Sequence, residues 1–128
     1  MEGWKKGDIY LANLDPVVGV EQAGTRPVLV VQNDVVNPLL PTLLAAPLTS
    51  KLKAGRFLLT VPLPAKATGL PKDSVALLFR IRTLEKRRLI RKIGRLSEEL
   101  IEKVDLQITL AFGLETYLAP VWLGKLER

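Results

Sequence analysis

Two residue types are missing from this chain of 128 residues, which contains no cysteine and no histidine. Without cysteine there is no disulfide framework and no thiolate nucleophile. Zinc sites built on cysteine and histidine are excluded, and so is catalysis by Ser-His or Cys-His pairs. The acidic residues Asp8, Asp15, Glu21 and Asp34 show no D-x-D or similar spacing, whereas a two-metal nuclease needs several converging carboxylates. We therefore expect no metal site and no thiol or imidazole chemistry.

Motifs for nucleotide cofactors and for membrane insertion are also missing. Neither G-x-G-x-x-G nor G-x-x-x-x-G-K-[ST] occurs, so we expect no nucleotide cofactor. The first residues, Met1 to Lys6, are not followed by the apolar segment of a signal peptide. The longest apolar stretch, residues 39–48, is interrupted by Pro41 and Pro47 and is too broken to span a bilayer. We expect a cytoplasmic protein with no cofactor and no membrane segment.

Positive charge is abundant, with a formal net charge of +6. Lys and Arg fill eight of the sixteen positions from 80 to 95, where Glu85 is the only acid. Lys51, Lys53 and Arg56 form a second basic cluster. Such clusters predict a track for the phosphate backbone of a nucleic acid, while the alternative is an edge strand whose charges prevent aggregation. Because only two Trp, two Tyr and three Phe are present, an aromatic-rich reader of single strands is not expected.

Short apolar segments separated by Gly and Pro turns fill the chain up to residue 95. They predict strands over residues 8–14, 26–33, 42–48, 57–62, 75–84 and 87–95, with a loop over 64–71. Ser97 is then a candidate helix N-cap, followed by two glutamates in the first turn and by apolar residues at helical spacing. Gly113 is the expected stop of this helix. The pattern predicts an α+β domain, for which a small barrel capped by the helix is the natural architecture.

The length predicts a single domain, which we place at residues 1–113. A domain of this size buries enough surface to form a core without disulfides or metals. Residues 114–128 contain Pro120 and Trp122 and show no clear period. We expect this C-terminal extension to pack on the domain or on a second subunit.

A polar loop over residues 17–25 runs into Arg26 and then into an apolar strand. Pro27 disfavours the helical conformation for the residue before it and lacks an N–H, so Arg26 is expected at the extended start of the strand. A permanent guanidinium cation at this junction can clamp a phosphate or stabilise a phosphorane transition state. The alternative is a structural ion pair of Arg26 with Glu21 or Asp34.

Two hydroxyl residues, Thr49 and Ser50, end one of the expected strands. A hydroxyl there can donate to a phosphate oxygen, while the commoner alternative is a hydroxyl that satisfies its own turn. At the far end of a later expected strand, Arg80 and Arg82 are two residues apart. Both are therefore expected on one face of that strand.

The segments Gly7–Pro16 and Gly19–Pro27 read GDIYLANLDP and GVEQAGTRP. They are followed by PLTS at 47–50, DSV at 73–75, IRT at 81–83 and KIG at 92–94. In this order the segments resemble the motifs of the MazF/PemK family of toxins. The resemblance spans about residues 5–113, ending with the expected helix.

The resemblance implies a compact SH3-like β-barrel with helices, of the kind shared by MazF, PemK and CcdB, that acts as a homodimer. It implies a sequence-specific, metal-independent endoribonuclease that cuts single-stranded RNA, chiefly mRNA. The substrate's own 2′-OH would attack the adjacent phosphorus, leaving a 2′,3′-cyclic phosphate and a 5′-OH. A cognate antitoxin would inhibit the toxin by laying an acidic, initially disordered tail into the RNA groove.

The family's catalytic arginine and threonine fall on Arg26 and Thr49 of this chain. Glu21 is then the expected base or the residue that orients Arg26. The residues expected to bind RNA are Gln22, Thr25, Ser50, Lys51, Lys53, Arg80 and Arg82. The chain departs from the family at Phe79, where some relatives carry an acidic residue.

Two other functions stay open on the sequence. On the same kind of fold, a non-enzymatic toxin resembling the gyrase inhibitor CcdB would engage its target with a C-terminal aromatic residue, for which Trp122 is the candidate. A barrel that binds RNA without cleaving it would retain RNA with a steep salt dependence and yield no product.

Overall fold

The computed structural model describes residues 3–15, 24–118, 120 and 124. Glu21, Gln22 and Trp122, to which the sequence assigns candidate roles, lie outside these ranges. In the described part, none of the helices combines the length and the apolar character that a bilayer crossing requires.

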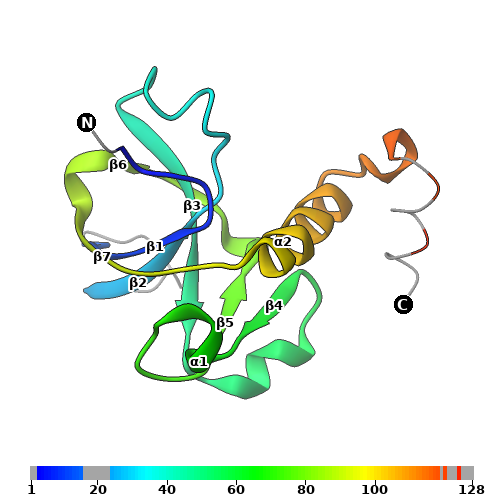
Figure 1. Ribbon diagram of the computed structural model, residues 1–128, viewed down its shortest axis with the longest axis horizontal. Helices are drawn as coiled ribbons and strands as arrows, with labels where there is room; N and C mark the ends of the chain where they lie inside the picture. Colours follow the sequence, from blue (N-terminus) through cyan, green and yellow to red (C-terminus); the bar gives the residue numbers. More distant parts are fainter. Residues whose placement is uncertain (1–2, 16–23, 119, 121–123, 125–128) are drawn as a thin grey trace.

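Seven strands form one curved antiparallel sheet (Figure 1). They are β1 (Asp8–Asn13), β2 (Thr25–Val30), β3 (Thr42–Thr49), β4 (Thr60–Leu63), β5 (Ser74–Leu77), β6 (Arg82–Glu85) and β7 (Leu89–Arg95). Their order is β4-β5-β3-β2-β1-β7, and β6 pairs with β3 beside this path. The sheet is not closed in the part of the chain that the structure describes, but its curvature gives the barrel-like α+β fold that the sequence predicts.

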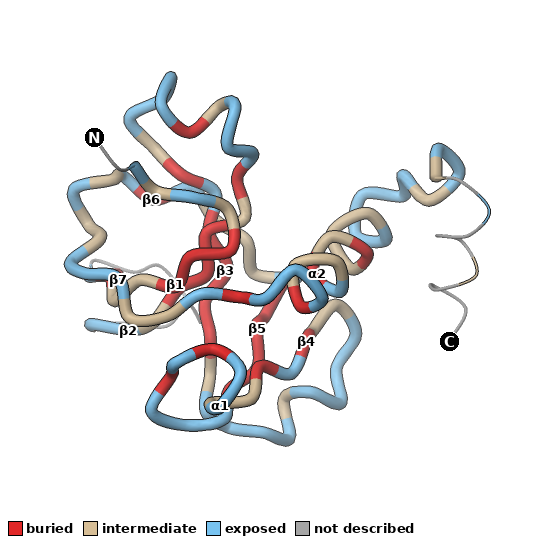
Figure 2. The backbone as a smooth tube through the Cα atoms, in the orientation of Figure 1, coloured by how far each residue is buried: buried red, intermediate tan, exposed pale blue. Residues whose placement is uncertain are grey.

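The central strand β3 belongs to both halves of the sheet. One of its edges pairs with β2 through residues 45–47. Its other edge pairs first with β6 through residues 42–45 and then with β5 through residues 48 and 49. Buried residues fill most of its length (Figure 2), so this apolar segment forms the middle of the molecule.

The prediction of one continuous strand over residues 75–84 is wrong. The 3₁₀ helix η2 (Leu78–Arg80) separates β5 from β6. The break lies where the chain passes from one half of β3 to the other, and Leu78 is buried at this crossing. Arg80 and Arg82 therefore lie in different elements, and the strand alternation expected to place them on one face does not connect them.

Short helices replace parts of other expected strands and loops. The 3₁₀ helix η1 (Leu52–Arg56) takes up the basic turn, and the strand expected from Phe57 begins only at Thr60. Leu59 has a φ of +61°, a left-handed conformation that a strand does not use. The remaining short helices are α1 (Ala65–Thr68) in the loop expected over 64–71, η3 (Lys86–Arg88) ahead of β7, and η4 (Glu115–Tyr117).

The C-terminal helix α2 (Glu98–Ala111) begins and ends where the sequence predicts. The Ser97 hydroxyl accepts a hydrogen bond from the Leu100 N–H at 3.3 Å, as an N-cap does. Gly113 follows the helix with a φ of +67°, which glycine adopts without strain. Leu100 and Val104 join the main core, while the last turns of the helix extend beyond the sheet (Figure 1).

Asp8, at the start of β1, anchors the basic strand β7. Its side chain is 3% exposed, and Oδ1 accepts a hydrogen bond from the Arg95 guanidinium at 2.7 Å and lies 3.2 Å from the Lys92 ammonium. The other carboxylate oxygen accepts the backbone N–H of Lys5 at 3.0 Å. Two of the cations of the basic segment 80–95 therefore pair with a carboxylate of the neighbouring strand β1.

Candidate active site

A pocket of about 390 Å³ lies between the ends of β2 and β3. Its polar lining consists of Arg26, Thr49, Ser50, Lys51, Lys72 and Ser74. Its apolar lining consists of Leu11, Pro27, Leu48, Leu70, Pro71 and Ile93. The volume falls within the usual range of small-molecule sites, about 300–1,000 Å³, and the lining brings together segments that are far apart in sequence.

The register of β2 and β3 brings the two expected catalytic residues together. The two strands pair as far as Val28 and Pro47. Continued by two residues, the same register places Arg26 across from Thr49. Residues directly opposite each other on antiparallel neighbours have their side chains on the same face of the sheet. Both side chains line the pocket accordingly.

Two prolines end the ladder between β2 and β3 at this point. Beyond Pro47, the opposite edge of β3 pairs through Leu48 and Thr49 with β5. Pro27 and Pro47 have no N–H with which to extend the ladder between β2 and β3. The two strands therefore separate, and the space between them has Pro27 and Leu48 in its apolar lining.

Arg26 is exposed, and its backbone is fixed by pairing with Ala12 of β1. Its proposed structural partner Asp34 lines a different pocket. The Asp34 carboxylate accepts an N–H from the Asn37 side chain at 3.1 Å. The other proposed partner, Glu21, lies outside the described residues. The rigid sheet thus presents the Arg26 guanidinium at the pocket.

The Thr49 hydroxyl is oriented by the turn that follows it. Its Oγ1 accepts a hydrogen bond from the backbone N–H of Lys51 at 3.1 Å. As an acceptor, the Thr49 hydroxyl therefore does satisfy its own turn, as the alternative interpretation of the sequence expects. A threonine hydroxyl also has one proton to donate, and no described residue accepts it. Thr49 can therefore keep its turn and still donate a hydrogen bond into the pocket.

Four residues expected to bind RNA, namely Thr25, Lys53, Arg80 and Arg82, do not line this pocket. Lys53 lies in η1, and Arg82 pairs with Ala45 of β3. The guanidinium of Arg80 lies 5.5 Å from the centre of the Phe79 ring. That ring meets Phe57 edge to face, with 6.5 Å between the ring centres. Arg26, Thr49, Ser50 and Lys51 are the predicted residues that the fold brings together.

Two polar lining residues, Lys72 and Ser74, were missed by the reasoning from sequence. They flank Asp73: Lys72 lies in the turn between α1 and β5, and Ser74 is the first residue of β5. The DSV motif at 73–75 marked this region, but nothing local linked it to Arg26. Its place in the pocket depends on the pairing of β5 with β3, which is a long-range contact.

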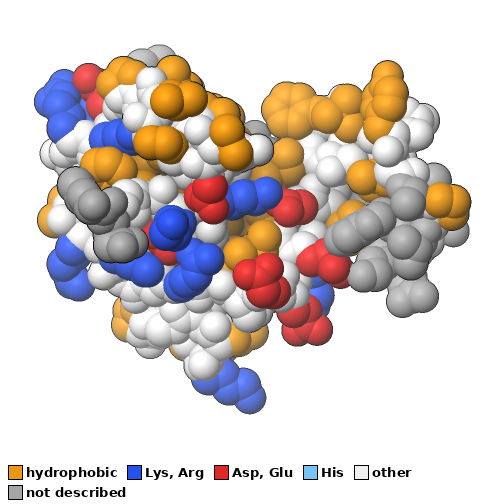
Figure 3. Space-filling model, turned by 45° about the horizontal axis from the view of Figure 1, so that its top comes forward, with side chains coloured by type: hydrophobic (Ala, Val, Ile, Leu, Met, Phe, Trp, Pro, Cys, Tyr) orange, Lys and Arg blue, Asp and Glu red, His pale blue; other side chains and the backbone are white. Residues whose placement is uncertain are grey.

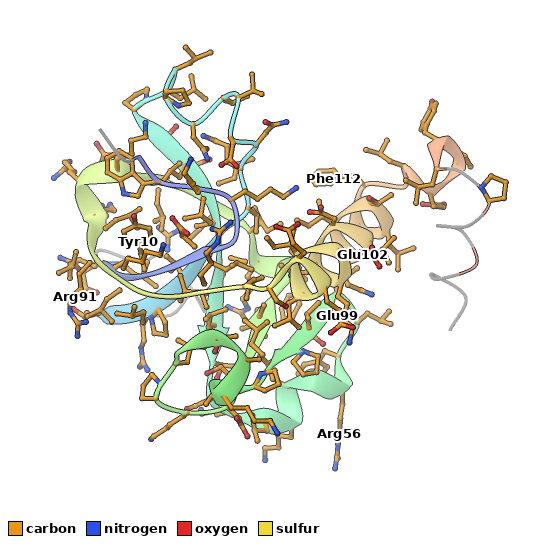
Figure 4. All side chains as sticks on the ribbon, viewed as in Figure 1. Tyr10, Arg56, Arg91, Glu99, Glu102 and Phe112 are labelled. Carbon is orange, nitrogen blue, oxygen red and sulfur yellow. The ribbon has the colours of Figure 1, made fainter. Side chains whose placement is uncertain are left out.

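Charge is unevenly distributed over the molecule. Basic side chains gather on the sheet, where a few acidic ones lie among them, and further acidic side chains lie on and beside α2 (Figure 3). Arg56 and Arg91 point outward from the body, while Glu99 and Glu102 are carried by α2 (Figure 4). Within residues 3–15 and 24–118, no group of three or more Asp and Glu side chains is arranged to hold a metal ion.

The described groups with shifted pKa values lie outside the pocket. Burial, and then the charge of Asp8, raises the pKa of the Tyr10 phenol. A hydrogen bond from Arg87, followed by its charge, lowers the pKa of the Glu85 carboxyl group. Neither Tyr10 nor Glu85 lines the pocket, so its chemistry rests on other groups.

The described lining of the pocket contains cations and hydroxyls but no acidic residue. Guanidinium, ammonium and hydroxyl groups are donors that bind phosphate oxygens. An open antiparallel sheet with such a pocket and a formal net charge of +6 defines a basic protein whose pocket can hold phosphate oxygens.

Comparison with known proteins identifies the family. Residues 5–112 match the family described as PemK-like, MazF-like toxin of type II toxin–antitoxin systems. Endoribonuclease EndoA of Bacillus subtilis is 49% identical over 109 residues, which is 84% of this chain and 94% of that protein. The Mycobacterium tuberculosis toxin MazF-mt6 superposes with a TM-score of 0.69 at 30% identity, covering 84% of this chain and 97% of the other. MazE–MazF of Deinococcus radiodurans gives a TM-score of 0.71 at 27% identity, covering 89% and 99%.

The chain therefore belongs to the PemK-like, MazF-like toxin family of type II toxin–antitoxin systems. This confirms the family and the fold that the sequence motifs predicted. The prediction of an endoribonuclease is confirmed at the level of the family, since the Bacillus subtilis relative carries that name.

The contact between the end of α1 and β7 provides a test of this architecture. A Cβ added at Gly94 would overlap the backbone oxygen of Thr68, which cannot move without shifting α1. We expect Gly94→Ala to lower the free energy of unfolding by about 2 kcal/mol, as overpacking does. Urea denaturation followed by circular dichroism measures this change.

Gly55→Ala is the matched control. Its added Cβ would lie 3.7 Å from a methyl group of Val75, an ordinary contact, so we expect a change within about 0.5 kcal/mol. Equal unfolding free energies for Gly94→Ala and the unaltered protein would show that α1 does not pack against β7 as described.

Proposed function

We propose that the protein is a sequence-specific, metal-independent endoribonuclease that cleaves single-stranded RNA, chiefly mRNA, in the cytoplasm. The observation that carries this proposal is the meeting of Arg26 and Thr49 in one cationic pocket from two separate strands. The name of the Bacillus subtilis relative supports the activity. The cleavage would leave a 2′,3′-cyclic phosphate and a 5′-OH.

RNA supplies the nucleophile in this reaction. The 2′-oxygen attacks the adjacent phosphorus, the bond from phosphorus to the 5′-oxygen breaks, and no water is consumed in forming the cyclic phosphate. The 2′-OH loses its proton to a base, and the departing 5′-oxygen gains one. The protein's tasks are to neutralise the charge that grows on the phosphate and to handle these two protons.

Arg26 would stabilise the developing charge with its permanent cation. Thr49 would donate a hydrogen bond from its hydroxyl to a non-bridging phosphate oxygen, while keeping the hydrogen bond that it accepts from the Lys51 N–H. Arg26 is unsuited to act as the base, since a guanidinium does not give up its proton in proteins. We propose Glu21, which lies outside the described residues, as that base or as the residue that orients Arg26.

The remaining RNA contacts would extend away from the pocket. Ser50 and Lys51 lie within it, while Lys53 follows in η1. We propose that these side chains, together with Gln22, Thr25, Arg80 and Arg82, bind the strand on either side of the cleaved bond. Arg80 lies over the exposed ring of Phe79, which meets the exposed ring of Phe57 edge to face.

A cognate antitoxin is the partner that the family description suggests. We propose that it carries an acidic segment that is disordered until it binds. Such a segment would lie in the RNA groove and compete with the substrate for the same cations. The acidic side chains on α2 would repel such a segment, so the basic face of the sheet is the surface complementary to its charge (Figure 3).

We further propose that the chain is a homodimer, in which the extension 114–128 packs on the domain or on the partner. Exposed apolar side chains gather near the end of α2 (Figure 3): Leu110, Phe112, Leu114 and Tyr117, with exposures of 43, 68, 48 and 84%. Apolar surface of this kind marks an interaction site.

Light scattering is expected to give twice the chain mass of 14.2 kDa, and the variant Phe112→Ser is expected to form a weaker dimer. A monomer at all micromolar concentrations would refute the proposal.

The activity is tested by incubating the protein with a long single-stranded RNA in excess EDTA and mapping the new ends. We expect cleavage at defined sites, with 5′-OH and 2′,3′-cyclic phosphate ends. Ends carrying 5′-phosphate would contradict the proposed chemistry. RNA that is retained without cleavage would favour the non-catalytic barrel, and inhibition of DNA gyrase in a parallel assay would favour a toxin of the CcdB kind.

Arg26→Ala is expected to lower the cleavage rate by about 100-fold or more, as loss of one oxyanion stabiliser does. The rate is measured under single-turnover conditions with saturating protein, so that weaker RNA binding does not contribute. Lys103→Ala removes one positive charge from the exposed face of α2 and is expected to leave the rate within about twofold. Near-normal cleavage by Arg26→Ala would remove Arg26 from the mechanism.

A further inference from the structure

Lys72 is a cation of the pocket that the proposed mechanism does not use. The pocket contains three cations from three separate segments: Arg26 from β2, Lys51 from the turn after β3, and Lys72 from the turn before β5. Lys72 is exposed, and it forms no ion pair within residues 3–15 and 24–118. Its ammonium group is therefore available to an anion that enters the pocket.

The turn that carries Lys72 is fixed on both sides. The backbone carbonyl of Lys72 accepts a hydrogen bond from the Ser74 hydroxyl at 3.1 Å. The neighbouring Asp73 carboxylate accepts the Ala65 N–H at 2.8 Å, which ties the turn to the start of α1. Leu70, two residues earlier, is buried in the main core. The Lys72 side chain thus extends from a backbone whose position is set by the fold.

The Ser74 hydroxyl is already engaged within the protein, so it is not the group in this turn that would bind a ligand. Ser74 lines the pocket but is buried, and its proton goes to the Lys72 carbonyl. Asp73 likewise directs its carboxylate to α1 and not to its neighbour's ammonium. Of the side chains in this turn, Lys72 is the one placed to meet a ligand in solution.

A single-stranded RNA carries one negative charge on every phosphate. A strand that enters the pocket therefore brings neighbouring phosphates as well as the scissile one. In the proposed mechanism Arg26 and Thr49 act on the scissile phosphate. A lysine is a compact charge on a flexible stem and demands no particular orientation of its partner. Such a group suits a phosphate whose role is to hold the strand in place and not to react.

We propose that Lys72 binds an RNA phosphate adjacent to the scissile one and thereby holds the strand in the pocket. This inference rests on the proposed function. Lys72 is a positioning residue in this account, because it does not contact the reacting atoms. Its loss is expected to weaken RNA binding while leaving the chemical step almost unchanged.

The binding test uses a fluorescently labelled single-stranded RNA with a 2′-deoxynucleotide at a mapped cleavage site, so that the strand stays intact. Each phosphate contact to a single strand contributes about 0.7 to the slope of log affinity against log salt concentration. Lys72→Ala is therefore expected to bind about fivefold more weakly at 0.1 M salt and to lower that slope by about 0.7. Lys72→Arg keeps the charge and is expected to restore the affinity.

The control is Lys66→Ala, which removes the same charge from the exposed surface of α1, outside the pocket lining. Its affinity and salt slope are expected to match those of the unaltered protein. On cleavable RNA, Lys72→Ala is expected to raise KM by a similar factor with kcat within about twofold. A fall in kcat at unchanged KM would contradict the positioning role.

The two proposals fail in different ways. If the unaltered protein cleaves no RNA, the proposed function is wrong. The affinities of the unaltered protein and of the two variants are then compared on an unmodified strand of the same sequence, since binding does not depend on cleavage. If Lys72→Ala and Lys66→Ala have equal affinities and equal salt slopes, the inference about Lys72 is wrong, whether or not the RNA is cleaved.

Discussion

The candidate site depends on one constraint, the end of the ladder between β2 and β3. The two strands pair as far as Val28 and Pro47, while the opposite edge of β3 pairs with β5 at Leu48 and Thr49. Because Pro27 and Pro47 have no N–H, the ladder between β2 and β3 stops at a fixed place and the two strands separate there. The separation leaves Arg26 and Thr49 across from each other with space between them. A longer ladder would have closed the pocket with main-chain hydrogen bonds.

This geometry explains how a protein without histidine or cysteine can belong to a family of nucleases. The proposed reaction takes its nucleophile from the ribose, so the protein needs groups that bind and stabilise an oxyanion. Backbone pairing fixes the arginine, and a turn hydrogen bond orients the threonine hydroxyl. Electrostatic stabilisation is strongest when the donors are already in place before charge develops. A rigid sheet is well suited to hold them.

Local signals in the sequence predicted the individual parts of this arrangement. Pro27 restricts the residue before it and so placed Arg26 at a strand start, and the Ser97 cap located α2. The failures come from long-range pairing. The break between Arg80 and Arg82 arises because β5 and β6 pair with different parts of β3. The place of Lys72 in the pocket depends on the pairing of β5 with β3. Neither the break nor the place of Lys72 is encoded in a window of neighbouring residues. The family motifs identified the fold, but they did not resolve these two details.

The central claim is that Arg26 and Thr49 act on the same phosphate as one unit. A double-mutant cycle on the single-turnover cleavage rate tests it most directly, with Arg26→Ala, Thr49→Val and the combined variant. Groups that act together on one transition state are strongly non-additive. The account predicts that the combined variant is slower than Arg26→Ala by far less than the factor that Thr49→Val costs alone. Rate losses that simply multiply would contradict it.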